Sequence, residues 1–109
     1  MTAQVADRNY EIAVTIIEQM GGMQKLQTMV SARNLVAIDY GLQFNFFGNR
    51  KINQLVVRLD PMDTYTVEFW KIYGLKIGKA PKMVSSYDGI YFDMIITLFE
   101  KETGLCLRL

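Results

Sequence analysis

The sequence predicts a single α+β domain over residues 1–109: two N-terminal helices, a four- to five-stranded and mostly antiparallel sheet, and one C-terminal helix packed on the sheet. Apolar residues recur every three or four positions near both ends, which is typical of amphipathic helices. Between residues 34 and 85 apolar and polar residues alternate, which is typical of half-buried strands. The short connections in that stretch favour hairpins over parallel crossovers.

The N-terminal part of the chain predicts a helical hairpin. Asp7 is a suitable N-cap for a first helix, whose apolar stripe ends at Met20. Gly21 is expected to end this helix in the left-handed conformation, and Gly22 lets the chain reverse. A second, shorter helix is expected over about 23–32, with four apolar residues on its buried face: Met23, Leu26, Met29 and Val30.

The middle of the chain predicts strands joined by tight turns. The expected strands are 35–38, 42–46, 55–59 and 64–69. Gly41 is available for positive φ in the first turn, and Asp60-Pro61-Met62-Asp63 forms a later turn. The alternation becomes less clean after Phe69, at Trp70, Ile72 and Tyr73, and a bulge or a loop is expected where Gly74 and Gly78 interrupt the stretch that follows. An edge strand should follow, marked by Lys79, Pro81 and Lys82, and 83–84 should close the sheet.

A last helix is expected from about Ser86 to Thr103, started by a capping box at 85–88. It should bury one stripe on the sheet: Tyr91, Met94, Ile95, Leu98 and Phe99. Gly104 is a natural terminating residue, and residues 105–109 then form a short strand or a packed tail. Asp93 is expected to be a buried, hydrogen-bonded acid, with a partner contact as the alternative, and Cys106 a small core residue.

Composition disfavours several classes of function. The chain has no histidine, one cysteine and a net charge of +1. Histidine is the commonest general base and zinc ligand, and no Asp-rich loop offers a calcium or magnesium site, so we expect no metal, no cofactor and no enzymatic activity. The N-terminus lacks the pattern of a signal peptide, and the apolar stretches are too short to span a bilayer. We therefore expect a cytoplasmic protein without a membrane partner.

Two sets of residues in the middle of the chain are candidates for binding. An irregular stretch rich in large side chains is the candidate contact with a partner protein: Trp70, Lys71, Tyr73 and Lys76. Cations near these aromatics are the candidate contact with nucleic acid: Arg50, Lys51, Arg58, Lys79 and Lys82. Basic residues mixed with aromatics are typical of single-strand binders. The structural alternatives are edge-strand protection for the cations and core packing for the aromatics.

The C-terminal stretch 87–94 reads Tyr-Asp-Gly-Ile-Tyr-Phe-Asp-Met, and Leu98-Phe99 and Thr103-Gly104-Leu105 follow it. This ending resembles a family of small uncharacterised proteins of phages and bacterial mobile elements, which ends in Tyr-acidic-x-Val-Tyr-x-Asp-Met, then Phe, then Thr-Gly-Leu. Segments 19–22, 32–34 and 63–69 agree with the same family in order and spacing. The chain departs from it at Met29-Val30-Ser31, where Met-Thr-Gly is usual, and at Gly89, where a larger residue is usual.

The resemblance implies an origin in a phage or mobile element, and hence the cytoplasm of a bacterial host, but no particular chemistry. We expect a non-enzymatic protein-binding module, with inhibition or adaptation of a host defence protein as one role. The alternative is a nucleic-acid-binding accessory protein that uses the basic-aromatic surface. The expected partner is a host or phage protein; nucleic acid and a homodimer remain open.

Overall fold

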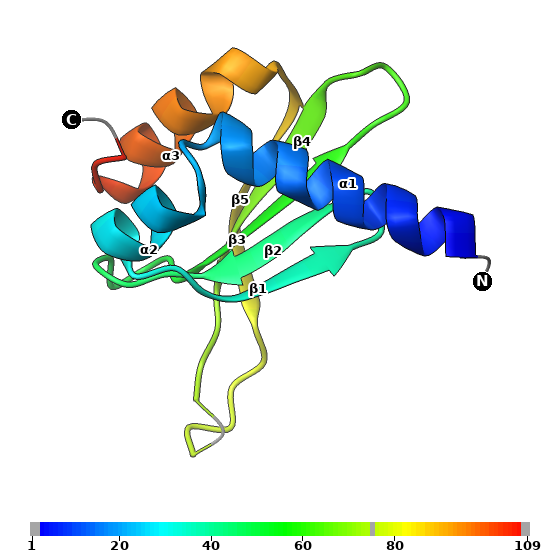
Figure 1. Cartoon of the computed structure of the whole chain (residues 1–109). Coiled ribbons are helices and arrows are strands. Elements are labelled where there is room, and N and C mark those ends of the chain that lie inside the picture. Colours follow the sequence, from blue (N-terminus) through cyan, green and yellow to red (C-terminus); the bar gives the residue numbers. More distant parts are fainter. Residues whose placement is uncertain (1–2, 75, 108–109) are drawn as a thin grey trace.

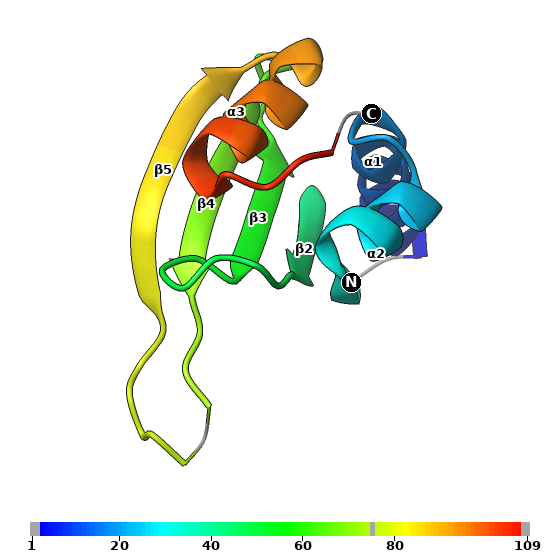
Figure 2. The same ribbon diagram turned by 90° about the vertical axis from the view of Figure 1, so that its left-hand side faces the viewer.

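The computed structural model describes residues 3–74 and 76–107. Its elements are α1 (Ala3–Gln19), α2 (Met23–Val30), β1 (Arg33–Ile38), β2 (Gly41–Asn45), β3 (Gln54–Leu59), β4 (Tyr65–Lys71), β5 (Lys82–Ile90), the 3-10 turn η1 (Phe92–Met94) and α3 (Ile95–Thr103). The strands form one antiparallel sheet of five strands in the order β1-β2-β3-β4-β5. The described helices lie on one face of this sheet (Figure 1 and Figure 2). The predicted α+β architecture is therefore confirmed.

The core lies between the sheet and the helices. The alternation predicted for the central strands is confirmed by their buried residues: Leu42, Phe44, Phe46, Leu55, Val57, Tyr65, Val67 and Phe69. The helices contribute the facing stripes: Ile12, Ala13, Ile16, Met20, Leu26, Val30, Ile95 and Phe99. Phe99 of α3 meets Phe46 edge to face, with ring centroids 5.1 Å apart. The C-terminal helix is thus part of the same core.

The turn between β3 and β4 is built by Asp60, within the turn predicted at 60–63. Asp60 Oδ2 accepts the hydroxyl of Thr64 at 2.6 Å, and its Oδ1 accepts the N–H of Met62 at 2.8 Å. The bond from the Thr64 hydroxyl is the main reason why the pKa of the Asp60 carboxyl is lowered. Asp63 completes the turn with a φ of 66°, which a short polar side chain tolerates.

The turn between β1 and β2 differs from the prediction. The residue with positive φ is Tyr40, at 57°, and not Gly41. Gly41 is required for a different reason, because a Cβ atom there would lie 2.0 Å from the carbonyl oxygen of Val57 on β3. Asn9 of α1 holds the turn, since its Oδ1 accepts the Tyr40 N–H at 2.8 Å.

The N-terminal hairpin reverses where predicted. Gly21 and Gly22, between the helices, have φ values of 107° and 96°. Asp7 is not the N-cap, because it lies inside α1. The second helix is shorter than predicted, since Ser31 turns left-handed with a φ of 55°. Met23 was expected on the buried face, but it starts the helix and is 41% exposed.

The predicted helix over 86–103 is wrong in its first part, and the sheet does not close at 83–84. Residues 86–90 continue β5, because pairing with β4 outweighs the local capping pattern. Two residues predicted to be buried by the helix are therefore exposed: Tyr91 at 59% and Met94 at 47%. The rest of that stripe is buried or partly buried: Ile95, Leu98 and Phe99.

Four smaller predictions concern the C-terminal end. Asp93 and Cys106 are exposed, so neither is the core residue that the sequence suggested. Gly104 ends α3 as predicted: its φ is 72° and its N–H donates to the Glu100 carbonyl. Leu107 is fully buried and Leu105 packs against the same core, so residues 105–107 of the tail pack on the core, while 108–109 lie outside the described residues.

The loop predicted around Gly74 and Gly78 is present as the connection between β4, which ends at Lys71, and β5, which begins at Lys82, and the register between these strands also shifts between Phe69 and Trp70. β5 is an edge strand of the sheet, as predicted from Lys82 and from Lys79 and Pro81 just before it. The connection between β4 and β5 projects beyond the helices (Figure 1). Of the candidate binding residues, Trp70, Lys71 and Lys82 lie at the base of this projection, and Lys76 and Lys79 lie within it.

Candidate functional site

The alternation of β4 places Trp70 and Lys71 on opposite faces of the sheet. Phe69 is fully buried under the helices, so Trp70 points to the open face and Lys71 returns to the helix side. Tyr73 lies with Lys71. The residues predicted as one surface for a partner protein are therefore divided between two surfaces.

The first surface is a basic cleft of about 440 Å³ on the helix side, at the base of the β4–β5 projection. We use the name basic cleft for the hollow lined by these residues: Arg50, Lys51, Lys71, Tyr73, Lys82 and Val84. Lys71 and Lys82 face each other as a register pair of β4 and β5. Like charges directly opposite on neighbouring strands repel. None of the described residues that line the cleft is acidic, so an anion would relieve this repulsion.

The aromatic member of the cleft is surrounded by cations. The Nζ atom of Lys71 lies 5.9 Å from the centroid of the Tyr73 ring, and that of Lys79 lies 5.3 Å from it. Both distances are within the range of a cation–π contact. Lys79 therefore belongs to the surroundings of the cleft. The arrangement offers a bound group an aromatic face and several positive charges together.

Two asparagines hold the chain segments that form the cleft. Asn49 accepts the N–H of Lys51 at 2.7 Å and donates from Nδ2 to the carbonyl of Thr103 at 2.8 Å. Asn53 exchanges two hydrogen bonds with the backbone of Ile72, at 2.7 and 2.9 Å. These hydrogen bonds fix the loop that contains Arg50 and Lys51, and they also fix the segment after β4 that contains Tyr73.

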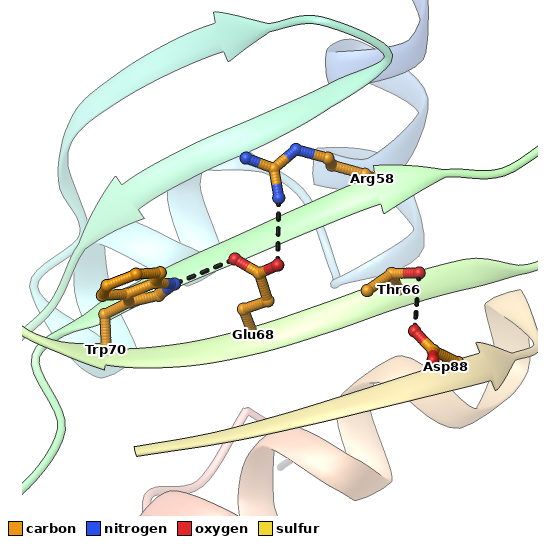
Figure 3. Close-up of polar contacts among 5 residues, drawn as sticks. All are labelled: Arg58, Thr66, Glu68, Trp70 and Asp88. Carbon is orange, nitrogen blue, oxygen red and sulfur yellow. Dashed lines mark hydrogen bonds and ion pairs between the residues drawn. The ribbon is translucent and has the colours of Figure 1, made fainter. Parts of the chain in front are cut away.

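The second surface lies on the open face of the sheet (Figure 3). Arg58 reaches from β3 to Glu68 on β4, with 3.2 Å between Nη1 and Oε2. The indole N–H of Trp70 donates to the other carboxylate oxygen of Glu68 at 2.9 Å. On the same face, Thr66 donates to Asp88 of β5 at 3.1 Å. Arg58 is thus neutralised by an acid and lies away from the basic cleft.

A groove of about 340 Å³ runs beside Trp70. It is lined by apolar and polar side chains of the open face: Gln43, Gln54, Val56, Arg58, Glu68, Trp70, Ile72 and Pro81. Val56 is only 3% exposed although all the described helices lie on the other face of the sheet (Figure 1 and Figure 2). The neighbouring side chains therefore cover it, and half-buried Trp70 is both a packing residue and an accessible one.

The structure brings together most of the predicted cations. Arg50, Lys51, Lys71 and Lys82 line the basic cleft with Tyr73, and Lys79 adjoins them. Trp70 and Arg58 lie on the opposite face. Lys76 is exposed in the projecting connection and is outside the lining of both hollows.

Sequence reasoning missed three residues. Asn49 and Asn53 carry the hydrogen bonds that fix the cleft, and Glu68 joins Arg58 to Trp70. The signal for Asn49 was present, since asparagine between a glycine and two polar residues is typical of a turn that bonds its own backbone. The role of Asn53 depends on contacts distant in sequence, and no local pattern indicates it.

No group of three or more His, Cys, Asp or Glu side chains within residues 3–74 and 76–107 is arranged to hold a metal ion. In the same part of the chain, no helix has the length and apolar character needed to cross a membrane. Comparisons with protein-family models, with curated proteins and with solved structures find no match to this chain.

Proposed function

We propose that this protein is a non-enzymatic binding module that binds single-stranded nucleic acid through the basic cleft. One observation carries the proposal: four cationic side chains and Tyr73 line a single hollow without an acidic residue among its described lining residues. Single-strand binders combine cations that follow the phosphates with aromatic rings on which bases stack.

The dimensions favour a single strand over a duplex. A hollow of about 440 Å³ lies in the range of sites for small ligands, roughly 300 to 1,000 Å³. It therefore suits one nucleotide and not the width of a double helix. A base must leave a stack to meet the face of Tyr73, and a single strand permits this at lower cost.

The test is a salt-dependent anisotropy titration with labelled oligothymidine and oligouridine of about 20 nucleotides, and with a duplex of the same length. If about three or four phosphates are neutralised, the slope of log K against log salt should be roughly −2 to −3 for single strands. Binding that prefers duplex, or that does not weaken with salt, would contradict the proposal.

A protein-binding module of phage or mobile-element origin is the second candidate. The groove beside half-buried Trp70, which includes Ile72 and Pro81, favours it, because tryptophan is enriched at the energetic centres of interfaces. A host defence protein to be inhibited or adapted, or a second copy of the chain, would be the partner. Under either candidate function, we propose that the protein acts in the cytoplasm of a bacterial host.

The second candidate has its own test. Host proteins retained by the immobilised chain should be lost with Trp70→Ala and kept with Lys82→Gln, since only the first change alters the groove. Light scattering over a concentration series would detect a homodimer. Retention that is lost only with Lys82→Gln would assign binding to the basic cleft instead.

A further inference from the structure

One wall of the basic cleft is shaped by the side chain of Asn49. Its Oδ1 accepts the N–H groups of Lys51 at 2.7 Å and Ile52 at 3.0 Å, which folds the intervening loop tightly. Its Nδ2 donates to the carbonyl of Thr103 at the end of α3. The preceding Gly48 lies so close to Leu105 that a Cβ would be 2.7 Å from its Cδ2. The loop is therefore fixed both to itself and to the C-terminal tail.

The opposite wall is shaped by Asn53. Its Oδ1 accepts the N–H of Ile72 at 2.7 Å and its Nδ2 donates to the Ile72 carbonyl at 2.9 Å. This two-bond exchange is the pattern of an antiparallel backbone pair, made here by a side chain. It lies beyond the last register pair of β3 and β4, Gln54 with Trp70. The antiparallel pairing geometry of β3 and β4 therefore extends to Ile72, the residue before Tyr73.

We infer that Asn49 and Asn53 are positioning residues that hold the two walls of the basic cleft in their binding geometry before a phosphate arrives. The inference rests on the proposed nucleic-acid function. Neither asparagine lines the cleft, so each acts through the backbone of the cationic or aromatic residues beside it.

The physical reason is the entropy of ordering. A loop or strand end that must be ordered on binding reduces the affinity, whereas one that is already fixed does not. Removing an asparagine amide leaves the number of cations unchanged. The affinity should therefore fall while the slope of log K against log salt, which counts the phosphates neutralised, stays the same.

The experiment compares Asn49→Ala and Asn53→Ala with the unaltered chain, using oligothymidine of about 20 nucleotides over a salt series. We expect affinities about fivefold to tenfold weaker at each salt concentration, on parallel lines. Asn45→Ala is the matched control, because Asn45 is a half-buried asparagine of β2, the strand next to β3. The affinity of this variant for oligothymidine should stay within about twofold of that of the unaltered chain.

A second readout separates positioning from general stability. ¹⁵N relaxation should show lower order in the free variants at 50–51 for Asn49→Ala and at 72–73 for Asn53→Ala, and oligothymidine should restore it. Unchanged affinity in both variants, with binding by the unaltered chain, would overturn this inference alone, and so would a shallower salt slope. Absence of salt-dependent binding by the unaltered chain would overturn both proposals. If Asn53→Ala does not fold by circular dichroism, Asn49→Ala decides the outcome.

Discussion

Glu102 of α3 accepts the hydroxyl of Tyr87 on β5 at 2.6 Å. The same carboxylate oxygen accepts the hydroxyl of Ser85 at 2.9 Å. Residues two apart in a strand point to the same face, so one carboxylate can reach both. This contact joins the edge strand to the helix that covers it.

The bond to Glu102 raises the pKa of Tyr87, and burial adds to the effect. Below the ordinary tyrosine pKa of about 10, Tyr87 is neutral in both the folded and the unfolded chain, and the contribution to stability is complete. As the pH rises further, the unfolded chain loses the proton first, so this contribution is lost as the pH approaches and passes the folded-state pKa. The gap in urea midpoint between the unaltered chain and Tyr87→Phe should therefore shrink above about pH 10. A constant gap would contradict the assignment.

Phe99→Ala tests the packing of α3 on the sheet. Phe99 is 1% exposed and meets Phe46 edge to face. Truncation should lower the free energy of unfolding by about 3 to 5 kcal/mol, as is usual for a buried aromatic. Phe92→Ala is the matched control, because Phe92 is 59% exposed and its loss should change the value by no more than about 0.5 kcal/mol. Equal effects in chemical denaturation would mean that α3 does not pack as described.

The sequence predicted the sheet well where each strand carries its own alternation. β2, β3 and β4 place large apolar residues on every second position, and the period alone decides their faces. The boundary between β5 and α3 failed because Ser85-Ser86-Tyr87-Asp88 suits both a capping box and an alternating strand. The deciding partner is β4, where Val67 pairs with Tyr87, and a local pattern does not contain a residue so distant in sequence.

The same limit applies to the candidate site. Part of the basic cleft was predicted, since Arg50 and Lys51 are adjacent in sequence and Lys82 follows a proline, but Lys71 and Tyr73 were assigned to the other candidate surface. The assignment of Trp70 and Tyr73 to different faces was missed because the sequence pattern after Phe69 indicated an irregular stretch, whereas β4 stays regular to Lys71 and residues three apart in an extended chain point to opposite faces. Asn53 continues this geometry to Ile72, which is 19 residues away in sequence, and it offers no signal of its own.

Gly41→Ala tests the contact between β2 and β3. A Cβ at Gly41 would lie 2.0 Å from the carbonyl oxygen of Val57, so the strands must shift. We expect a loss of about 1 to 3 kcal/mol in the free energy of unfolding. Gly74→Ala is the control, since an added Cβ there meets nothing within 4 Å and the smaller entropy of the unfolded chain should leave stability unchanged or slightly higher. Equal thermal melts for the two variants would contradict the reason given for Gly41.

Lys82→Gln tests the charge of the basic cleft. Lys82 is exposed and lines the cleft, so its removal should make the salt slope for oligothymidine less negative by about 0.7. Arg8→Gln removes the same charge from an exposed arginine of α1, beside the β3–β4 turn at the opposite end of the strands. Its slope should stay unchanged. If both variants make the salt slope less negative by the same amount, binding depends on the overall charge of the protein and not on the cleft.

Tyr73→Ala and Trp70→Ala together separate the two candidate functions, because the sheet holds these rings on opposite faces. If Tyr73 stacks on a base, its truncation should weaken oligothymidine binding by about 1 to 3 kcal/mol with no change in salt slope. Trp70→Ala should leave this affinity unchanged. It should instead lower the free energy of unfolding by about 1 kcal/mol or more, because Val56 loses cover and Glu68 loses a hydrogen-bond donor.

The control for this comparison is Tyr10→Ala, since Tyr10 is a tyrosine of α1 that is 66% exposed. Neither its melting temperature nor its affinity for oligothymidine should change. If Trp70→Ala weakens oligothymidine binding as much as Tyr73→Ala does, nucleic acid does not use the cleft as proposed. If Tyr73→Ala has no effect and Trp70→Ala abolishes retention of a host protein, the groove of the open face is the working surface and the second candidate replaces the first.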